Sequence, residues 1–280
     1  MADYGGRLKF LRRRADRPPR RFSRGVSLLP SLFTVANLFC GYACVVYAMR
    51  GEYETAAPFI GFAIVLDILD GRIARLTGTT SEFGVEFDSL ADVISFGMAP
   101  AILSFTWGLS SLGRLGWAAG FLFVTAAAMR LARFNIQAAS GGDKRYFVGM
   151  PSPAAAGVPA ATVFAYPAGV YDPGPAMLAL AMVLVPAVLM VSTIRFRSFK
   201  TIDLQVRRPY TVLLFIAVGI MLITTHPRFV LVAMAYTYLA SAFIGQAVTR
   251  LRHRGGHPLP EPAGGSADAA ARDTVSHSGH

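Results

Sequence analysis

Apolar stretches of membrane-spanning length recur between residues 28 and 249, separated by short polar breaks. About 20 apolar residues, each rising about 1.5 Å along an α-helix, cover the hydrocarbon core of a bilayer. We expect about eight such segments, at 28–49, 55–75, 88–110, 115–138, 153–170, 175–195, 210–225 and 228–249. Proline and glycine cluster in the breaks, which suits short turns between antiparallel helices. The pattern predicts an all-α, polytopic bundle of about eight transmembrane helices.

The composition agrees with a membrane location. Hydrophobic residues make up 54% of the chain and charged residues 15%, whereas about a quarter of the residues of a typical soluble domain are charged. We therefore expect an integral membrane protein.

Basic residues are spread unevenly over the polar parts of the chain. They crowd the N-terminal stretch RLKFLRRRADRPPRRFSRG and recur in the second, fourth and sixth breaks and after the last apolar segment. Lys and Arg mark the cytoplasmic side of a membrane protein, so both termini and the even-numbered breaks are expected in the cytoplasm. Topology and attraction to anionic lipid headgroups account for the net charge of +11. Nucleic-acid binding is not expected.

The two ends of the chain differ in composition from its apolar middle. We expect a basic cytoplasmic arm at 1–26, a helical bundle at 27–200 that carries the functional residues, additional transmembrane helices at 201–254, and a disordered tail at 255–280. The tail is rich in Pro, Gly, Ala and His and has no apolar periodicity.

Four aspartates stand out in the stretch DILDGRIARLTGTTSEFGVEFDSLAD, residues 67–92. Asp67 and Asp70 are three apart and Asp88 and Asp92 four apart, so each pair projects from one face of a helix. The glycine-containing break between the pairs lets the two helices run antiparallel, which brings four carboxylates together. Four anions in one cleft need cations, and ligands that are all oxygen favour one or two Mg²⁺ or Mn²⁺ ions over zinc.

The residues around these aspartates suit a phosphorylated ligand. Magnesium commonly accompanies substrate phosphates, and paired metals stabilise the attacking and leaving oxygens of a displacement at phosphorus. Arg72 and Arg75 add cationic donors, and Gly71 and Ala74 leave room for a nucleotide or diphosphate to approach the helix backbone. The alternative is that the aspartates form ion pairs with these arginines.

Eight residues at fixed spacing form one pattern between residues 67 and 92, D-x2-DG-x2-AR-x8-G-x3-D-x3-D. This pattern resembles the signature of the CDP-alcohol phosphotransferases, membrane enzymes that join an alcohol to the phospho-alcohol part of a CDP-linked donor and release CMP. The resemblance implies that the four aspartates hold divalent metal ions and that Asp92 is also the candidate general base. It implies a nucleotide and diphosphate site shaped by Gly71, Ala74, Arg75 and Gly84.

Further stretches resemble the phosphatidylserine synthase branch of that family. They are LPSLFTVANLFCGY (29–42), SLADVISFGMAPA (89–101), RLARFN (130–135), FVGMPSPAAA (147–156) and RFRSFK (195–200). This resemblance covers roughly residues 27 to 200. It implies transfer of a phosphatidyl group from CDP-diacylglycerol to L-serine, and a homodimer. We expect direct transfer rather than a covalent phosphatidyl-enzyme, because the sequence shows no paired histidine–lysine motif. Other acceptors within the family, glycerol 3-phosphate or an inositol phosphate, stay open, as do a cation transporter and a membrane scaffold.

A serine acceptor requires a cationic clamp for its carboxylate. The candidates for contact with serine or phosphate are Arg130, Arg133, Arg195 and Lys200. Anchoring of the cytoplasmic face is the alternative role of these residues. Asn135 and Ser152 are further candidates, although polar residues at helix ends commonly serve as caps. We expect the active site at the cytoplasmic face of a bacterial plasma membrane.

Overall fold

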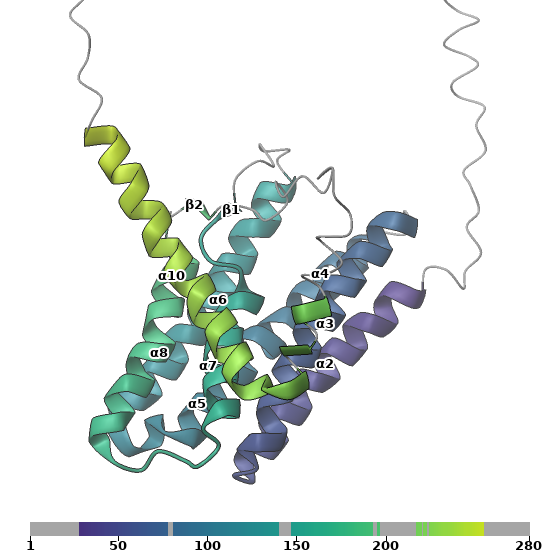
Figure 1. Ribbon diagram of the computed structural model, residues 1–280. Coiled ribbons are helices and arrows are strands. Elements are labelled where there is room, and N and C mark those ends of the chain that lie inside the picture. Colours follow the sequence, from purple (N-terminus) through teal and green to yellow (C-terminus); the bar gives the residue numbers. More distant parts are fainter. Residues whose placement is uncertain are drawn as a thin grey trace, which may run out of the picture.

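The protein is represented by a computed structural model of the 280-residue chain, which describes residues 28–77, 81–139, 147–192, 195–196, 217–219, 221–222 and 224–254. These residues form a bundle of helices with a single pair of two-residue strands (Figure 1). The helices are α2 (Leu28–Met49), α3 (Tyr53–Thr77), α4 (Glu82–Asp92), the π-helical turn η1 (Val93–Met98), α5 (Ala99–Trp107), the 3₁₀ turn η2 (Leu109–Leu112), α6 (Arg114–Ala139), α7 (Ser152–Ala165), α8 (Pro173–Val191) and α10 (Pro227–Arg254). The strands are β1 (Phe147–Val148) and β2 (Arg195–Phe196). The predicted all-helical fold is confirmed.

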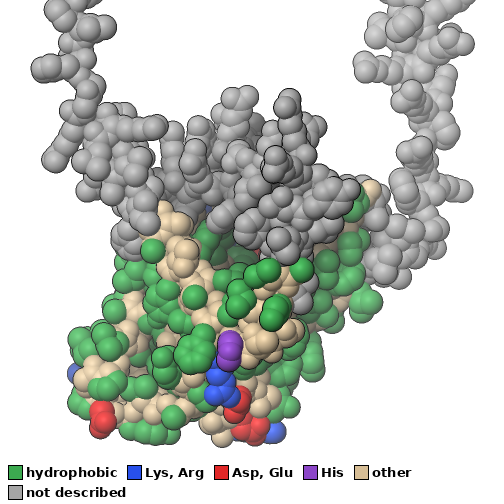
Figure 2. All heavy atoms as spheres, viewed as in Figure 1, with side chains coloured by type: hydrophobic (Ala, Val, Ile, Leu, Met, Phe, Trp, Pro, Cys, Tyr) green, Lys and Arg blue, Asp and Glu red, His purple; other side chains and the backbone are tan. Residues whose placement is uncertain are grey.

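Four of the described helical segments are long and apolar enough to cross a membrane. They are Ser31–Met49, Glu82–Trp107, Arg114–Gln137 and Pro173–Val191. Hydrophobic side chains dominate the flank of the molecule in Figure 2, and the visible charged side chains gather at its lower end. The chain is an integral membrane protein.

The predicted apolar segments match the described helices in all but one case, although eight membrane crossings stay a prediction. The segment 88–110 covers the second half of α4, then η1 and α5, and ends in η2. The exception is 210–225, most of which lies outside the described residues. The predicted arm at 1–26 and tail at 255–280 also lie outside them.

Small side chains allow the helices to pack closely. A tight turn joins α2 to α3, with Gly51 at a φ of 77° that L-residues with side chains rarely adopt.

The alanine-rich helix α7 contacts α3, α5, α8 and α10, and most of its residues are buried. Small residues let helix backbones approach each other in membrane bundles, where packing rather than the hydrophobic effect drives association.

The strand pair ties two distant parts of the chain together. Strands β1 and β2 are antiparallel, and Phe147 lies opposite Phe196. Directly after β1, Gly149 has a φ of +89°, and a Cβ there would lie 2.4 Å from the carbonyl oxygen of Met190. Only glycine fits both constraints, so the start of α7, with Ser152, is held against the end of α8.

Candidate functional site

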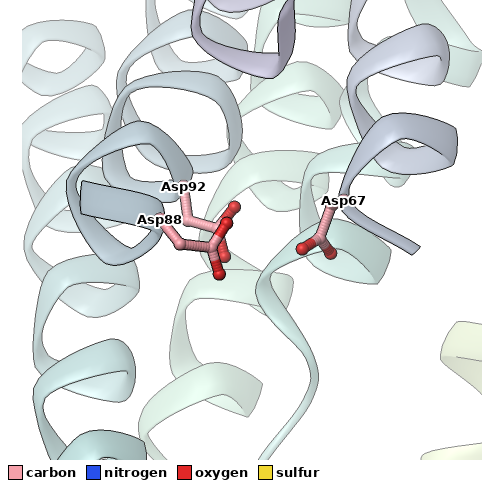
Figure 3. A group of neighbouring side chains, drawn as sticks. All are labelled: Asp67, Asp88 and Asp92. Carbon is pink, nitrogen blue, oxygen red and sulfur yellow. The ribbon is translucent and has the colours of Figure 1, made fainter. Parts of the chain in front are cut away.

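Three aspartates converge between α3 and α4. Asp67 extends from α3 toward Asp88 and Asp92 of α4 (Figure 3), and each contributes a carboxylate oxygen to a group in which these oxygens lie within 4.8 Å of one another. We call these three residues the aspartate cluster. The cluster lies about 9–15 Å from the adjoining ends of the two helices, because each intervening residue rises about 1.5 Å. The spacing of two aspartates four residues apart explains why both α4 side chains face α3.

The aspartate cluster fits a divalent cation. Asp92 is only 8% exposed, and Oδ1 of Asp88 is buried without a hydrogen-bond partner. Within the described part of the chain, none of the three carboxylates forms an ion pair. Burial and mutual repulsion both disfavour the charged carboxylates unless a cation offsets them. Carboxylate oxygens are ligands that Mg²⁺ and Mn²⁺ prefer.

Asp70, the fourth predicted ligand, does not belong to this group. Its side chain faces α2, where Thr34 Oγ1 donates a 2.5 Å hydrogen bond to its Oδ2. The residue is 6% exposed, so this bond satisfies a carboxylate oxygen that is largely shielded from water. The direction in which Asp70 points depends on how α2 packs against α3. The residue spacing within 67–92 does not specify that packing.

Helix α2 also supports the aspartate cluster, a contribution that our sequence analysis missed. Asn37 Nδ2 donates a 3.2 Å hydrogen bond to Asp92 Oδ1. Ser95, in η1, donates a 2.9 Å hydrogen bond to the carbonyl of Asn37. The available signal was the presence of two polar residues three apart, Thr34 and Asn37, in a mostly apolar helix, since such residues usually face the interior of a membrane bundle.

Arg130 is the predicted cationic residue that the structure places beside the aspartate cluster. From α6, its Nη1 donates a 2.8 Å hydrogen bond to Ser152 Oγ at the start of α7. Its guanidinium lies within electrostatic range of Asp67 and Asp92, and its Nε is buried without a hydrogen-bond partner. Tyr238 of α10 is a further electrostatic neighbour of Arg130. Arg130 therefore has a donor left over for a ligand.

The other predicted contacts for serine or phosphate are less defined. Arg133 is partly buried in α6 and forms no hydrogen bond or ion pair with the described residues. Arg195 lies in β2, but its side chain is not described, and Lys200 lies outside the described residues. Asn135 donates a 2.9 Å hydrogen bond to Ser89 on α4, which links α6 to the helix that carries two members of the aspartate cluster.

The predicted donor-site residues flank the same region. Gly71 is exposed on α3, and the side chains of Ala74 and Arg75, on the next turn, are not described. The backbone N–H of Gly84 donates a 3.0 Å hydrogen bond to Ser81 Oγ, the N-cap of α4. The region thus combines carboxylates for a metal ion, a guanidinium whose Nε has no hydrogen-bond partner, and an exposed glycine on α3. This combination suits a ligand that carries phosphate and a metal ion.

Comparison with known proteins agrees with this chemistry. The chain is 40% identical over 191 residues to the CDP-diacylglycerol–serine O-phosphatidyltransferase of Helicobacter pylori (strain ATCC 700392 / 26695), an alignment covering 68% of this chain and 80% of that protein. It is 30% identical over 175 residues to the Bacillus subtilis (strain 168) protein of the same name, covering 62% and 93%. It is 35% identical over 171 residues to archaetidylserine synthase of Methanothermobacter thermautotrophicus, covering 60% and 69%. The family profile described as CDP-alcohol phosphatidyltransferase matches residues 27–191. The chain therefore belongs to the CDP-alcohol phosphatidyltransferase family.

Proposed function

We propose that this protein transfers the phosphatidyl group of CDP-diacylglycerol to the hydroxyl of L-serine, forming phosphatidylserine and CMP. The observation that carries the proposal is the convergence of Asp67, Asp88 and Asp92 in a chain that is 40% identical to a CDP-diacylglycerol–serine O-phosphatidyltransferase. The relative named archaetidylserine synthase supports serine as the acceptor, because its name points to the same amino acid on a different lipid.

In this reaction the aspartate cluster, with Asp70 as a predicted fourth ligand, would hold two divalent ions, Mg²⁺ or Mn²⁺. When bound, such ions offset the charge of the diphosphate and stabilise the departing CMP. The geometry of the cluster supports a first ion. A second ion would need a carboxylate oxygen from Asp70. Thr34 bonds to Oδ2 of Asp70, so Oδ1 is the oxygen proposed for that ion.

Asp92 is the proposed general base. It takes the proton of the serine hydroxyl as the serine oxygen bonds to the lipid-bearing phosphorus. The bond from that phosphorus to the CMP oxygen breaks, and its electron pair leaves with CMP. A base must lie within hydrogen-bond reach of the proton that it abstracts, so serine has to bind directly beside α4.

Arg130 is the proposed clamp for the serine carboxylate or the diphosphate. Its bond to Ser152 leaves Nε free, and a guanidinium presents several donors in one plane, which suits carboxylate and phosphate oxygens. Arg133, Arg195 and Lys200 stay candidates for the same substrates. Gly71, Ala74, Arg75 and Gly84 are proposed to form the nucleotide and diphosphate site, as the family pattern implies.

The acyl chains of CDP-diacylglycerol would stay in the lipid while the headgroup enters between α3 and α4. We propose the cytoplasmic face of a bacterial plasma membrane as the location of the active site, and a homodimer as the assembly. The uneven distribution of Lys and Arg supports the orientation.

The test is CMP release from CDP-diacylglycerol by the purified protein in detergent, with Mg²⁺ or Mn²⁺ and with L-serine, glycerol 3-phosphate or an inositol phosphate. Of the three acceptors, we expect only L-serine to give lipid product. The Asp92→Asn variant should give no product with any of them. Product with a phosphorylated acceptor would keep the family chemistry but refute serine. A folded protein that releases no CMP with any acceptor would refute the transferase itself.

A further inference from the structure

Asn37 is a buried polar residue whose side chain contacts the aspartate cluster. It is 1% exposed, and its Nδ2 lies 3.2 Å from Asp92 Oδ1. The amide turns its NH₂ group toward Asp92 and donates this hydrogen bond. The other end of the amide, Oδ1, is buried without a partner. Only the end that faces Asp92 is satisfied, which indicates that the contact with Asp92 determines how the amide is oriented.

The backbone that carries Asn37 is fixed to the turn that follows Asp92. Ser95 lies three residues after Asp92 and donates a hydrogen bond of 2.9 Å to the Asn37 carbonyl. One turn further along α2, a Cβ on Gly41 would lie 2.6 Å from Ser95 Oγ and 2.9 Å from Ser95 Cα. Two hydrogen bonds and a close backbone approach therefore hold α2 against α4 and η1, so the backbone that carries the amide is fixed relative to Asp92.

We propose that Asn37 is a positioning residue for the phosphatidyl transfer. Its amide holds Oδ1 of Asp92 and thereby directs the second oxygen, Oδ2, toward the serine hydroxyl whose proton it takes. This inference rests on the proposed function, since it concerns the base of that reaction. Without this hydrogen bond, the Asp92 carboxylate would rotate between orientations. A small misplacement of a reacting group slows a reaction strongly.

The experiment compares the full-length wild-type protein with Asn37→Ala and Asn37→Val, which remove the amide donor with and without loss of bulk. Ser104→Ala is the matched control, because it removes a buried hydroxyl that bonds to the Pro100 carbonyl in α5 at 2.7 Å, away from the aspartate cluster. Steady-state kinetics with CDP-diacylglycerol and L-serine give kcat and both KM values. Electron paramagnetic resonance of free Mn²⁺ gives the metal affinity without any turnover.

We expect both Asn37 variants to lower kcat about 10- to 100-fold, the effect of losing a hydrogen bond to a charged group. Both KM values should stay within about threefold of wild type, because other groups bind the substrates. The Mn²⁺ affinity should fall much less than kcat, because Asp67 and Asp88 also hold the metal ion. Ser104→Ala should keep the wild-type kcat. A purely structural role would not lower kcat more strongly than it weakens substrate and metal binding.

Wild-type kcat in both Asn37 variants would overturn the inference while leaving the proposed function intact. A loss of Mn²⁺ affinity that parallels the loss of kcat would assign Asn37 to metal binding, and failure of both variants to fold would assign it to the core. Either result overturns the positioning role. A wild-type protein that releases no CMP with serine would refute the proposed function, and the inference with it.

Discussion

Replacing Gly41 by alanine should push α2 away from the turn that follows Asp92. The added Cβ would lie 2.9 Å from Ser95 Cα, which is 0.5 Å short of the 3.4 Å at which ordinary contact begins. Ser95 Cα belongs to the backbone, so rotation of a side chain cannot relieve the overlap. Overpacking of this kind costs about 1–3 kcal/mol. At about 2–4 °C per kcal/mol for a protein of this size, the melting temperature should fall by roughly 2–12 °C.

The same displacement should reach the site. A separation of this size would lengthen the hydrogen bond from Asn37 to Asp92 from 3.2 Å to about 3.7 Å, beyond hydrogen-bonding range. We therefore expect kcat for CMP release to fall about 10-fold with little change in KM for serine. Thermal unfolding in detergent and steady-state assays on the same preparation measure the two effects.

Gly61→Ala is the matched control for this prediction. Gly61 lies in α3, and a Cβ added there meets no atom within 4 Å. Alanine favours a helix over glycine by about 1 kcal/mol, so this variant should melt at the wild-type temperature or above and keep full activity. If Gly41→Ala also keeps the wild-type melting temperature and kcat, close packing of α2 on η1 does not maintain the site, and the argument from Ser95 fails.

Three other perturbations test separate parts of the structure. Asp67→Asn should raise the Mn²⁺ concentration needed for half-maximal CMP release at least about 10-fold after treatment with EDTA, and an unchanged metal titration would contradict a metal site at the aspartate cluster. Arg130→Lys keeps the charge but loses the planar fork, so KM for serine or CDP-diacylglycerol should rise about 10-fold in steady-state kinetics, whereas wild-type KM values would remove Arg130 from the substrate site. Glu54→Gln breaks an exposed ion pair with Arg228 and should change the free energy of unfolding by less than about 1 kcal/mol; a larger loss in thermal unfolding would mean that this pair holds α10 to α3.

Much of the helical framework follows from apolar length alone. Helices α2, α3, α6, α7, α8 and α10 lie where apolar segments predict them, because a helix that crosses lipid must satisfy its own backbone hydrogen bonds. The π-helical turn η1 was not predicted. It ends with the Ala99 N–H bonded to the Ile94 carbonyl, and it is followed by Pro100, which has no N–H to donate. Apolar length does not distinguish a π-helical turn from an α-helical one.

The aspartates show where prediction from spacing ends. Asp88 and Asp92 share a helix face through a spacing of four, and Asp67 meets them because α3 and α4 both pack on α2. Asp70 has the same kind of spacing from Asp67, yet it bonds to Thr34 of α2. Spacing within one helix predicts which residues share a face. It does not predict which neighbouring helix that face meets, because this depends on crossing angles set by side-chain packing.

Helix α2 explains why the family pattern alone does not make a functional site. The pattern at 67–92 supplies the carboxylates, but the partners of Asp70 and Asp92 are Thr34 and Asn37, three residues apart on a helix outside the pattern. Carboxylates pressed together in a largely apolar bundle repel one another and lose hydration. A donor at a fixed position lowers the energy of the charged form at one oxygen and leaves the other oxygen for the ligand. The site therefore requires a polar face on α2 as well as the spaced aspartates, and a chain that kept the pattern but had an apolar α2 should hold its carboxylates in the wrong orientation for transfer.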